Sequence, residues 1–246
     1  MANEIIAVTG ASRGIGAAVA LELARRGFTV ACLSRSGERP AGAAAEVAAR
    51  LLGFRCDVTD EATVRRALGE VVAPGRRLRG LVNNAGFHLQ GKSAEFPTAD
   101  FEKVMATNAT AVFVAAREAY PHLVAGGGGL VVNVGSFFDK MGVARNVAYC
   151  ASKAAVGAIT RCLAVEWASK GIQVVDVAPG YVLTDLNRSE LAPGSPLSRF
   201  LEKRIPTGGP TPPEPLARLV AALFSEAIPF LTGETIYFDG GQGVAL

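Results

Sequence analysis

Short runs of β-branched and apolar residues alternate with longer helix-forming stretches along the whole chain. Seven runs predict strands, at residues 4–10, 28–34, 53–58, 79–85, 129–136, 171–180 and 234–239. Helices are expected at 14–27, 41–50, 60–73, 98–125, 148–169 and 214–225. The strand runs are continuously apolar, which is typical of strands covered on both faces. The pattern therefore predicts an α/β fold, a doubly wound parallel sheet of about seven strands with right-handed crossovers.

No linker or shift of composition divides the 246 residues, so one domain over residues 1–246 is expected. Half of the residues are apolar and 19% are charged, which favours a buried core over disorder. A net charge of +3, evenly spread, disfavours a nucleic-acid partner. No apolar run reaches the roughly 18 residues of a membrane span. Because the N-terminus leads directly into a strand, no signal peptide is expected, and we predict a cytoplasmic protein.

The four cysteines predict neither disulfides nor a metal site. Cys32, Cys56, Cys150 and Cys162 form no CxxC pair and have no histidine at ligand spacing. We expect them to be buried, small hydrophobic residues in a reducing compartment.

The stretch TGASRGIG, residues 9–16, joins the first expected strand to the first expected helix. Gly10 permits a tight turn, and Gly14 and Gly16 allow a ligand to approach the backbone. Free N–H groups and the positive end of the helix dipole can bind a pyrophosphate there. The strand–turn–helix context is that of a dinucleotide-binding turn, although its GxxxGxG spacing differs from the common GxGxxG. A glycine-rich turn without a ligand is the alternative.

The second expected strand ends at Ser34 and Arg35, where a protein that binds NAD would place an acid for the ribose 2′-hydroxyl. An arginine there can bind a 2′-phosphate, which a carboxylate would repel. Arg13, in the glycine-rich turn, is expected to reach the same phosphate. We therefore predict NADP(H) rather than NAD.

Tyr149 and Lys153 are four residues apart in AYCASKAAVG, residues 148–157. In a helix this spacing brings a phenol and an ammonium onto one face, one turn apart. The alternative is an ordinary helix with a packed tyrosine and a solvated lysine.

Six motifs in order resemble those of the short-chain dehydrogenase/reductase family over essentially the whole chain. They are TGASRGIG, NNAG (83–86), Asn108, Ser136, YCASK (149–153) and Pro179-Gly180. The resemblance implies a single Rossmann-like domain that binds a nicotinamide dinucleotide. It is nearest to the branch of 3-oxoacyl-carrier-protein reductases and carbonyl reductases.

The resemblance also implies the roles of four catalytic residues. Tyr149 would exchange the proton of a carbonyl or alcohol substrate, and its phenolate needs a nearby cation because its ordinary pKa is about 10. Lys153 would supply that cation and hold the nicotinamide ribose. Ser136 would donate a hydrogen bond to the substrate oxygen. Asn108 would anchor a water relay to Lys153.

The resemblance also implies a cofactor site that extends beyond the glycine-rich turn. Asp57 would accept a bond from the adenine, and Pro179-Gly180 would bend the chain beside the nicotinamide. The full expected set is Gly10, Ser12, Arg13, Gly14, Ile15, Gly16, Ser34, Arg35, Asp57, Val58, Asn83, Ala85, Gly86, Tyr149, Lys153, Pro179, Gly180, Val182 and Thr184.

The substrate site is predicted less sharply. Residues 184–206 are expected to form a mobile substrate loop. Expected pocket walls are Phe87, His88, Phe137, Phe138, Val143 and Tyr181, which favour a neutral and fairly hydrophobic carbonyl compound or alcohol.

Two other functions and an assembly are also considered. AGGGG (125–129) stands where carrier-protein reductases place basic residues, which disfavours a carrier-protein substrate, although Lys170 is a second basic candidate. A non-catalytic NADP-binding sensor is disfavoured because Tyr149 and Lys153 are both present. The resemblance and the apolar C-terminal FDGGQGVAL imply a homotetramer.

Overall fold

The computed structural model describes residues 3–73, 75–185, 187–226 and 228–245. Seven strands form one sheet in the order β3-β2-β1-β4-β5-β6-β7, and every neighbouring pair is parallel. The strands are β1 (Glu4–Thr9), β2 (Thr29–Ser34), β3 (Leu51–Arg55), β4 (Arg77–Asn83), β5 (Gly129–Val134), β6 (Ile172–Pro179) and β7 (Thr235–Phe238). The predicted α/β architecture is confirmed.

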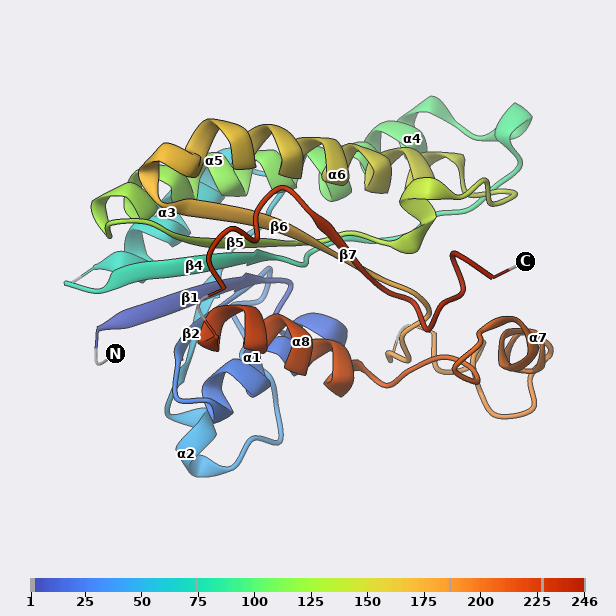
Figure 1. The fold of residues 1–246 in the computed structure, drawn as a ribbon, viewed down its shortest axis with the longest axis horizontal. Coiled ribbons are helices and arrows are strands. Elements are labelled where there is room, and N and C mark those ends of the chain that lie inside the picture. Colours follow the sequence, from blue (N-terminus) through green and yellow to red (C-terminus); the bar gives the residue numbers. More distant parts are fainter. Residues whose placement is uncertain (1–2, 74, 186, 227, 246) are drawn as a thin grey trace.

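Helices cover both faces of the sheet (Figure 1). One layer contains α1 (Gly14–Arg25) and α8 (Pro213–Ser225), and the other contains α3 (Glu61–Val72), α5 (Ala111–Ala125) and α6 (Val147–Trp167). Alternate residues of β1 enter the two cores: Ile6 and Val8 pack in the first, and Ile5 and Ala7 in the second. This division explains why the strand sequences lack an apolar/polar alternation.

Two predicted helices differ from those observed. The helix expected at 41–50 is only α2 (Ala45–Ala48), because Gly42 before it takes a positive φ of 73°. The strand after it begins at Leu51, two residues earlier than expected. The helix expected at 98–125 is divided into α4 (Thr98–Met105), a π-helical turn (Ala106–Thr110) and α5.

The carboxyl ends of the strands lie at one edge of the sheet, where α7 (Pro196–Arg204) also lies (Figure 1). The strand order reverses between β1 and β4, and parallel sheets of this kind bind ligands at that crevice. Short 3-10 turns, Ser93–Glu95, Phe137–Lys140 and Ala168–Lys170, complete the connections.

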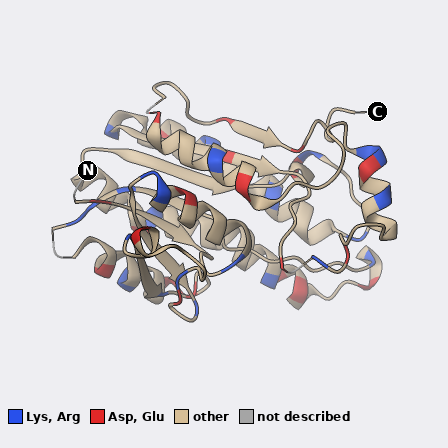
Figure 2. Ribbon diagram, turned by 90° about the horizontal axis from the view of Figure 1, so that it is seen from below, with Lys and Arg blue, Asp and Glu red and all other residues tan. Residues whose placement is uncertain are grey.

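Acidic and basic residues are interspersed over the molecule (Figure 2). Within the described ranges, no helix is long and apolar enough to cross a membrane, and no cluster of three metal-ligating side chains occurs. The cysteines are free, as expected, but only Cys32 and Cys56 are buried. Cys150 is half-buried and Cys162 is exposed, so the prediction of four buried cysteines was wrong, because α6 has a solvent-facing side.

Candidate active site

The glycine-rich turn has free backbone donors and little room for side chains. Gly10 and Gly14 take positive φ values of 66° and 58°, which favour glycine. A β-carbon at Gly16 would overlap the Gly10 carbonyl. Arg13, the N-cap of α1, provides no side-chain cap, and no acid lies in the first turn. The turn therefore fits a pyrophosphate at the helix N-terminus.

The turn after β4 is tied to the glycine-rich turn through Asn84. Its amide donates to the Thr9 carbonyl over 3.0 Å, and its backbone N–H donates to the Thr9 hydroxyl over 2.9 Å. Asn83, expected at the cofactor, is buried and donates to Asn133 Oδ1 over 2.9 Å, so it faces the helix layer. The sequence pattern did not single out Asn84, although the repeated Asn in NNAG was the available signal.

The end of β2 brings a cation and an acid together. Arg35 is exposed, and its charge helps to hold the pKa of Asp57 below the ordinary value, after the larger effect of two hydrogen bonds from Thr59. Those bonds to Asp57 Oδ1 come from the Thr59 hydroxyl (2.7 Å) and N–H (3.0 Å). Ser34 is buried and donates to the Glu38 carbonyl over 3.2 Å. The exposed Arg35 guanidinium can face an anionic ligand.

The remaining expected cofactor residues follow the carboxyl ends of other strands. A β-carbon at Gly14 would lie 3.5 Å from Thr184 Cγ2, so Thr184 adjoins the glycine-rich turn. Gly180 donates its N–H to the Phe238 carbonyl (3.0 Å), which continues the β6–β7 pairing past the end of β6. Further members of the set near this edge are Ser12, Ile15, Val58, Ala85, Gly86, Pro179 and Val182.

Ser136 and Tyr149 meet at the end of β5. Ser136 follows that strand and accepts a hydrogen bond from the Phe138 N–H over 3.3 Å. Burial raises the pKa of the Tyr149 phenol, and a hydrogen bond with Ser136 offsets part of that rise. The phenol is therefore protonated at neutral pH and suited to donate a proton to a substrate oxygen.

Lys153 lies one turn after Tyr149 on α6, and 6% of its surface is exposed. Its Nζ donates to the Val134 carbonyl over 2.8 Å and lies 5.7 Å from the Tyr149 ring centroid. Burial lowers the pKa of Lys153 to about 8, against the charge of Asp176. The ammonium can thus stabilise a Tyr149 phenolate, as the four-residue spacing predicted.

Asn108 lies in the π-helical turn and is buried. Its Oδ1 accepts the Phe87 N–H over 3.0 Å, and its Nδ2 donates to the Phe87 carbonyl (2.9 Å) and to Ser152 Oγ (3.2 Å). Ser152 in turn donates to the Tyr149 carbonyl over 2.8 Å. The Asn108 side chain thus connects the loop after β4 to the helix that carries Tyr149.

Aromatic rings surround Tyr149, largely as the expected pocket walls. Phe138 lies edge-on to Tyr149 with 5.8 Å between ring centroids. Phe137 and Tyr181 in turn pack against Phe138. The His88 ring is edge-on to Tyr149 at 4.7 Å and hydrogen-bonded to Asn146 Oδ1. The wall around Tyr149 is therefore aromatic, with one imidazole.

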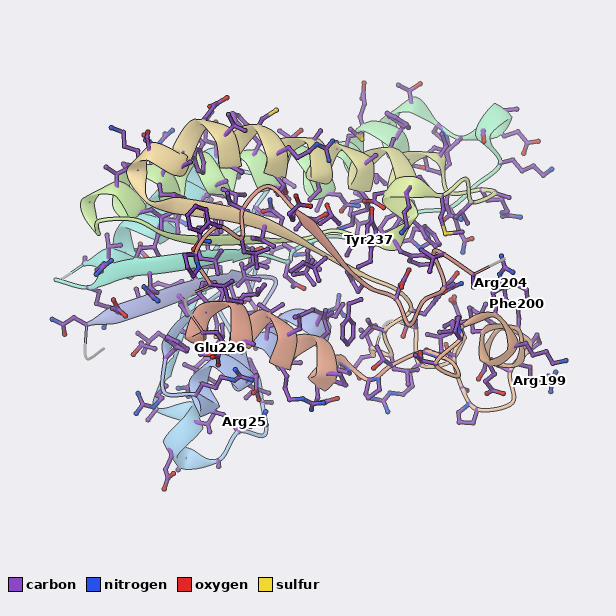
Figure 3. All side chains as sticks on the ribbon, in the orientation of Figure 1. Arg25, Arg199, Phe200, Arg204, Glu226 and Tyr237 are labelled. Carbon is purple, nitrogen blue, oxygen red and sulfur yellow. The ribbon has the colours of Figure 1, made fainter. Side chains whose placement is uncertain are left out.

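The segment expected to form the substrate loop contains α7 and has a small core of its own. Leu191, Leu201 and Ile205 are buried together, with Tyr181 packed against them. Arg199, Phe200 and Arg204 lie on α7 as labelled in Figure 3, and Phe200 is exposed. Residue 186 lies outside the described ranges. The segment is thus packed against the same aromatic wall.

Comparison with known proteins agrees with this geometry. A family model described as short chain dehydrogenase matches residues 4–193. The D-threitol dehydrogenase of Mycolicibacterium smegmatis is 33% identical over 98% of this chain and 94% of its own length. A human 3-oxoacyl-[acyl-carrier-protein] reductase is 34% identical over 99% of this chain and 100% of its own length. A gluconate 5-dehydrogenase from Burkholderia cenocepacia, solved with NADP and tartrate, superposes with a TM-score of 0.91 at 31% identity, covering 99% of this chain and 96% of that one.

Proposed function

Because the chain belongs to the short-chain dehydrogenase family, a family of oxidoreductases acting on alcohols and carbonyl compounds, we propose that it is specific for NADP(H) and uses Tyr149 as its acid–base group. The observation that carries the proposal is the meeting of Ser136, Tyr149 and buried Lys153 at the carboxyl edge of the sheet. Ser136, Tyr149, Lys153 and Asn108 are the proposed catalytic set.

Each side chain has a separate task in the proposed reaction. The cofactor, when bound, supplies or accepts the hydride. Tyr149 gives a proton to the carbonyl oxygen in reduction and removes one from the alcohol in oxidation. Ser136 donates a hydrogen bond to the same oxygen, where negative charge develops. Lys153 stabilises the phenolate.

The proposed cofactor specificity depends on Arg35. The exposed guanidinium stands after β2, where an NAD-binding chain would carry an acid. Together with Arg13 it offers two cations to a 2′-phosphate. The uncapped start of α1 fits the pyrophosphate.

For the substrate we propose a small alcohol or its carbonyl compound, with a fairly hydrophobic part against Phe138 and Tyr181. Reduction of a carrier-protein substrate is the second candidate, favoured by the human relative of that name. Turnover of a 3-oxoacyl group on its carrier protein well above that of the free thioester would select this candidate. We also propose a cytoplasmic homotetramer.

The acid–base proposal is tested by Tyr149→Phe, which removes the hydroxyl and keeps the ring. We expect kcat for NADPH-dependent carbonyl reduction to fall by about 100-fold or more, with a similar Kd for NADPH. Tyr120→Phe is the matched control, because Tyr120, on α5, packs against Trp167 at the far end of α6, with 4.9 Å between the ring centroids. Near-normal turnover of Tyr149→Phe would refute the proposal.

A further inference from the structure

Asp176 is a carboxylate in the interior of β6 that the proposed reaction does not use. It has no exposed surface. Its Oδ2 accepts a hydrogen bond from Thr235 Oγ1 over 3.2 Å, while its Oδ1 has no hydrogen-bond partner among the described residues. A buried, incompletely bonded carboxylate is costly, so an opposite charge nearby is needed to stabilise its ionised form.

The sheet register brings this carboxylate to the residues that hold Lys153. Asp176 is paired with Asn133 across the β5–β6 ladder, and Val177 is paired with Val134. The Val134 carbonyl accepts the Lys153 hydrogen bond over 2.8 Å. A β-carbon on the next residue, Gly135, would overlap both oxygens of Asp176. The absence of a side chain at position 135 therefore makes room for the carboxylate beside the lysine's anchor point.

Other ionisable groups near the pair come from four elements. They are Tyr149 and Cys150 on α6, Asp139 and Lys140 in the 137–140 turn, Tyr237 on β7 and Asp239 after it. Asp139 accepts the Tyr237 hydroxyl over 2.9 Å. Of these groups, Asp176 is the one whose charge offsets the effect of burial on the pKa of Lys153.

We propose that Asp176 is a positioning residue that supplies the buried counter-charge of the Lys153 ammonium. The inference rests on the proposed function in assigning Lys153 to the acid–base centre. Within the described part of the chain, the ammonium has only a neutral carbonyl as its hydrogen-bond acceptor, so a fixed negative charge helps to keep it protonated in this buried setting. Asp176 acts through Lys153 and touches no substrate.

The charge of each group offsets the effect of burial on the pKa of the other. Burial raises the pKa of Asp176 to about 6 against the positive charge of Lys153, and it lowers the pKa of Lys153 to about 8 against the negative charge of Asp176. Both groups are therefore charged between about pH 6 and pH 8. Removing the carboxylate removes the effect that raises the lysine's pKa, so Lys153 loses its proton at a lower pH.

The first test is the pH profile of Asp176→Asn, which is nearly isosteric. Carbonyl reduction by the unmodified enzyme should decline above about pH 8 as Lys153 deprotonates. In the variant we expect this decline to move to lower pH by about one unit. Asp139→Asn is the matched control, because it removes an acid near Asp176 that does not act on Lys153, and its decline should stay in place. A uniform loss at every pH, or an unmoved decline in Asp176→Asn, would overturn the inference.

The second test needs no turnover and separates this inference from the proposed function. Thermal unfolding at pH 7 is measured for Asp176→Asn, Lys153→Met and the double variant. Lys153→Met leaves a buried carboxylate unpaired, so we expect the double variant to have a higher Tm than Lys153→Met. If the single variants do not fold, recovery of folded protein in the double variant supports the pair. Additive losses of Tm, or failure of the double variant to fold, would contradict it. If the protein shows no turnover but the double variant still has a higher Tm than Lys153→Met, the proposed function is refuted and the pairing of Asp176 with Lys153 stands.

Discussion

Arg35 is the residue that we propose selects between the two nicotinamide dinucleotides. Arg35→Asp replaces a guanidinium that can bind a 2′-phosphate with a carboxylate that repels it and can accept a bond from a 2′-hydroxyl. We expect the ratio of kcat/KM for NADPH over NADH to fall by at least about tenfold, which corresponds to about 1.4 kcal/mol. Steady-state kinetics with both cofactors measures the ratio.

Arg39→Asp makes the same change of charge four residues further along the loop. The Arg39 guanidinium donates to the Ala48 and Leu51 carbonyls, so it faces α2 and β3. This control should retain the preference of the unmodified protein. An equal loss in both variants would show that net charge, rather than Arg35, selects the cofactor.

At the scale of residues, sequence spacing predicted where the proposed catalytic side chains lie, on one helix and at one strand end. Tyr149 and Lys153 are one turn apart on α6, and Ser136 follows β5, as the motifs indicated. The contribution of Asp176 was not predictable. It stands in the apolar run IQVVDVAPG, and its relation to Lys153 depends on the β5–β6 register, which no local pattern specifies.

Among the elements, the π-helical turn Ala106–Thr110 differs most from the sequence expectation. The alanine-rich composition of 98–125 predicted one helix, whereas the extra residue in this π-helical turn interrupts the α-helix. The turn brings Asn108 to both the N–H and the carbonyl of Phe87. The hydrogen bonds between the Asn108 amide and the backbone of Phe87 leave no periodic pattern in the sequence. The interruption of the helix therefore could not be predicted from the pattern of apolar residues alone.

We therefore expect Asn108→Leu to destabilise the protein more than an ordinary helix substitution. It would leave two backbone groups of Phe87 and the Ser152 hydroxyl without their partner, at a cost of about 1–3 kcal/mol in the free energy of unfolding. Urea denaturation measures this loss. The kcat should also fall, because Ser152 is bonded to the Tyr149 carbonyl.

Thr107→Ala is the control in the same turn. Thr107 is half-buried, and its hydroxyl donates locally to the Lys103 carbonyl over 3.0 Å. We expect Thr107→Ala to lower the free energy of unfolding by about a few tenths of a kcal/mol. If the two variants were destabilised equally, the turn would have no special connecting role.

For the molecule as a whole, the alternation of continuously apolar strand runs with helix-forming stretches was enough to predict the parallel sheet and its two helix layers. The prediction was less accurate where an alanine-rich segment contains turns. At 41–50 the alanine content suggested a helix, but only Ala45–Ala48 is helical. The site then follows from topology, because the carboxyl ends of parallel strands share one edge. The relative placement of Thr184 and Gly14, 170 positions apart, follows from that edge.

Assembly belongs to this same scale, and the exposed apolar residues bear on it. Val165, on α6, is 82% exposed, and Val244, in the C-terminal segment beside edge strand β7, is 81% exposed. Burial of such residues between copies of the chain would favour the proposed tetramer. We expect light scattering at micromolar concentration to give a mass four times the 25.5 kDa of the chain.

Charged substitutions can show which face associates. Val165→Glu would place a charge on the outer face of α6, and Val244→Asp would place one near β7, so each should weaken the interface that contains it and leave a dimer. Thr110→Glu, at an exposed position in the π-helical turn, is the charge control and should keep the full mass. A monomer in the unmodified protein at micromolar concentration would exclude the tetramer. A tetramer that survives both valine substitutions would show that other surfaces hold it together.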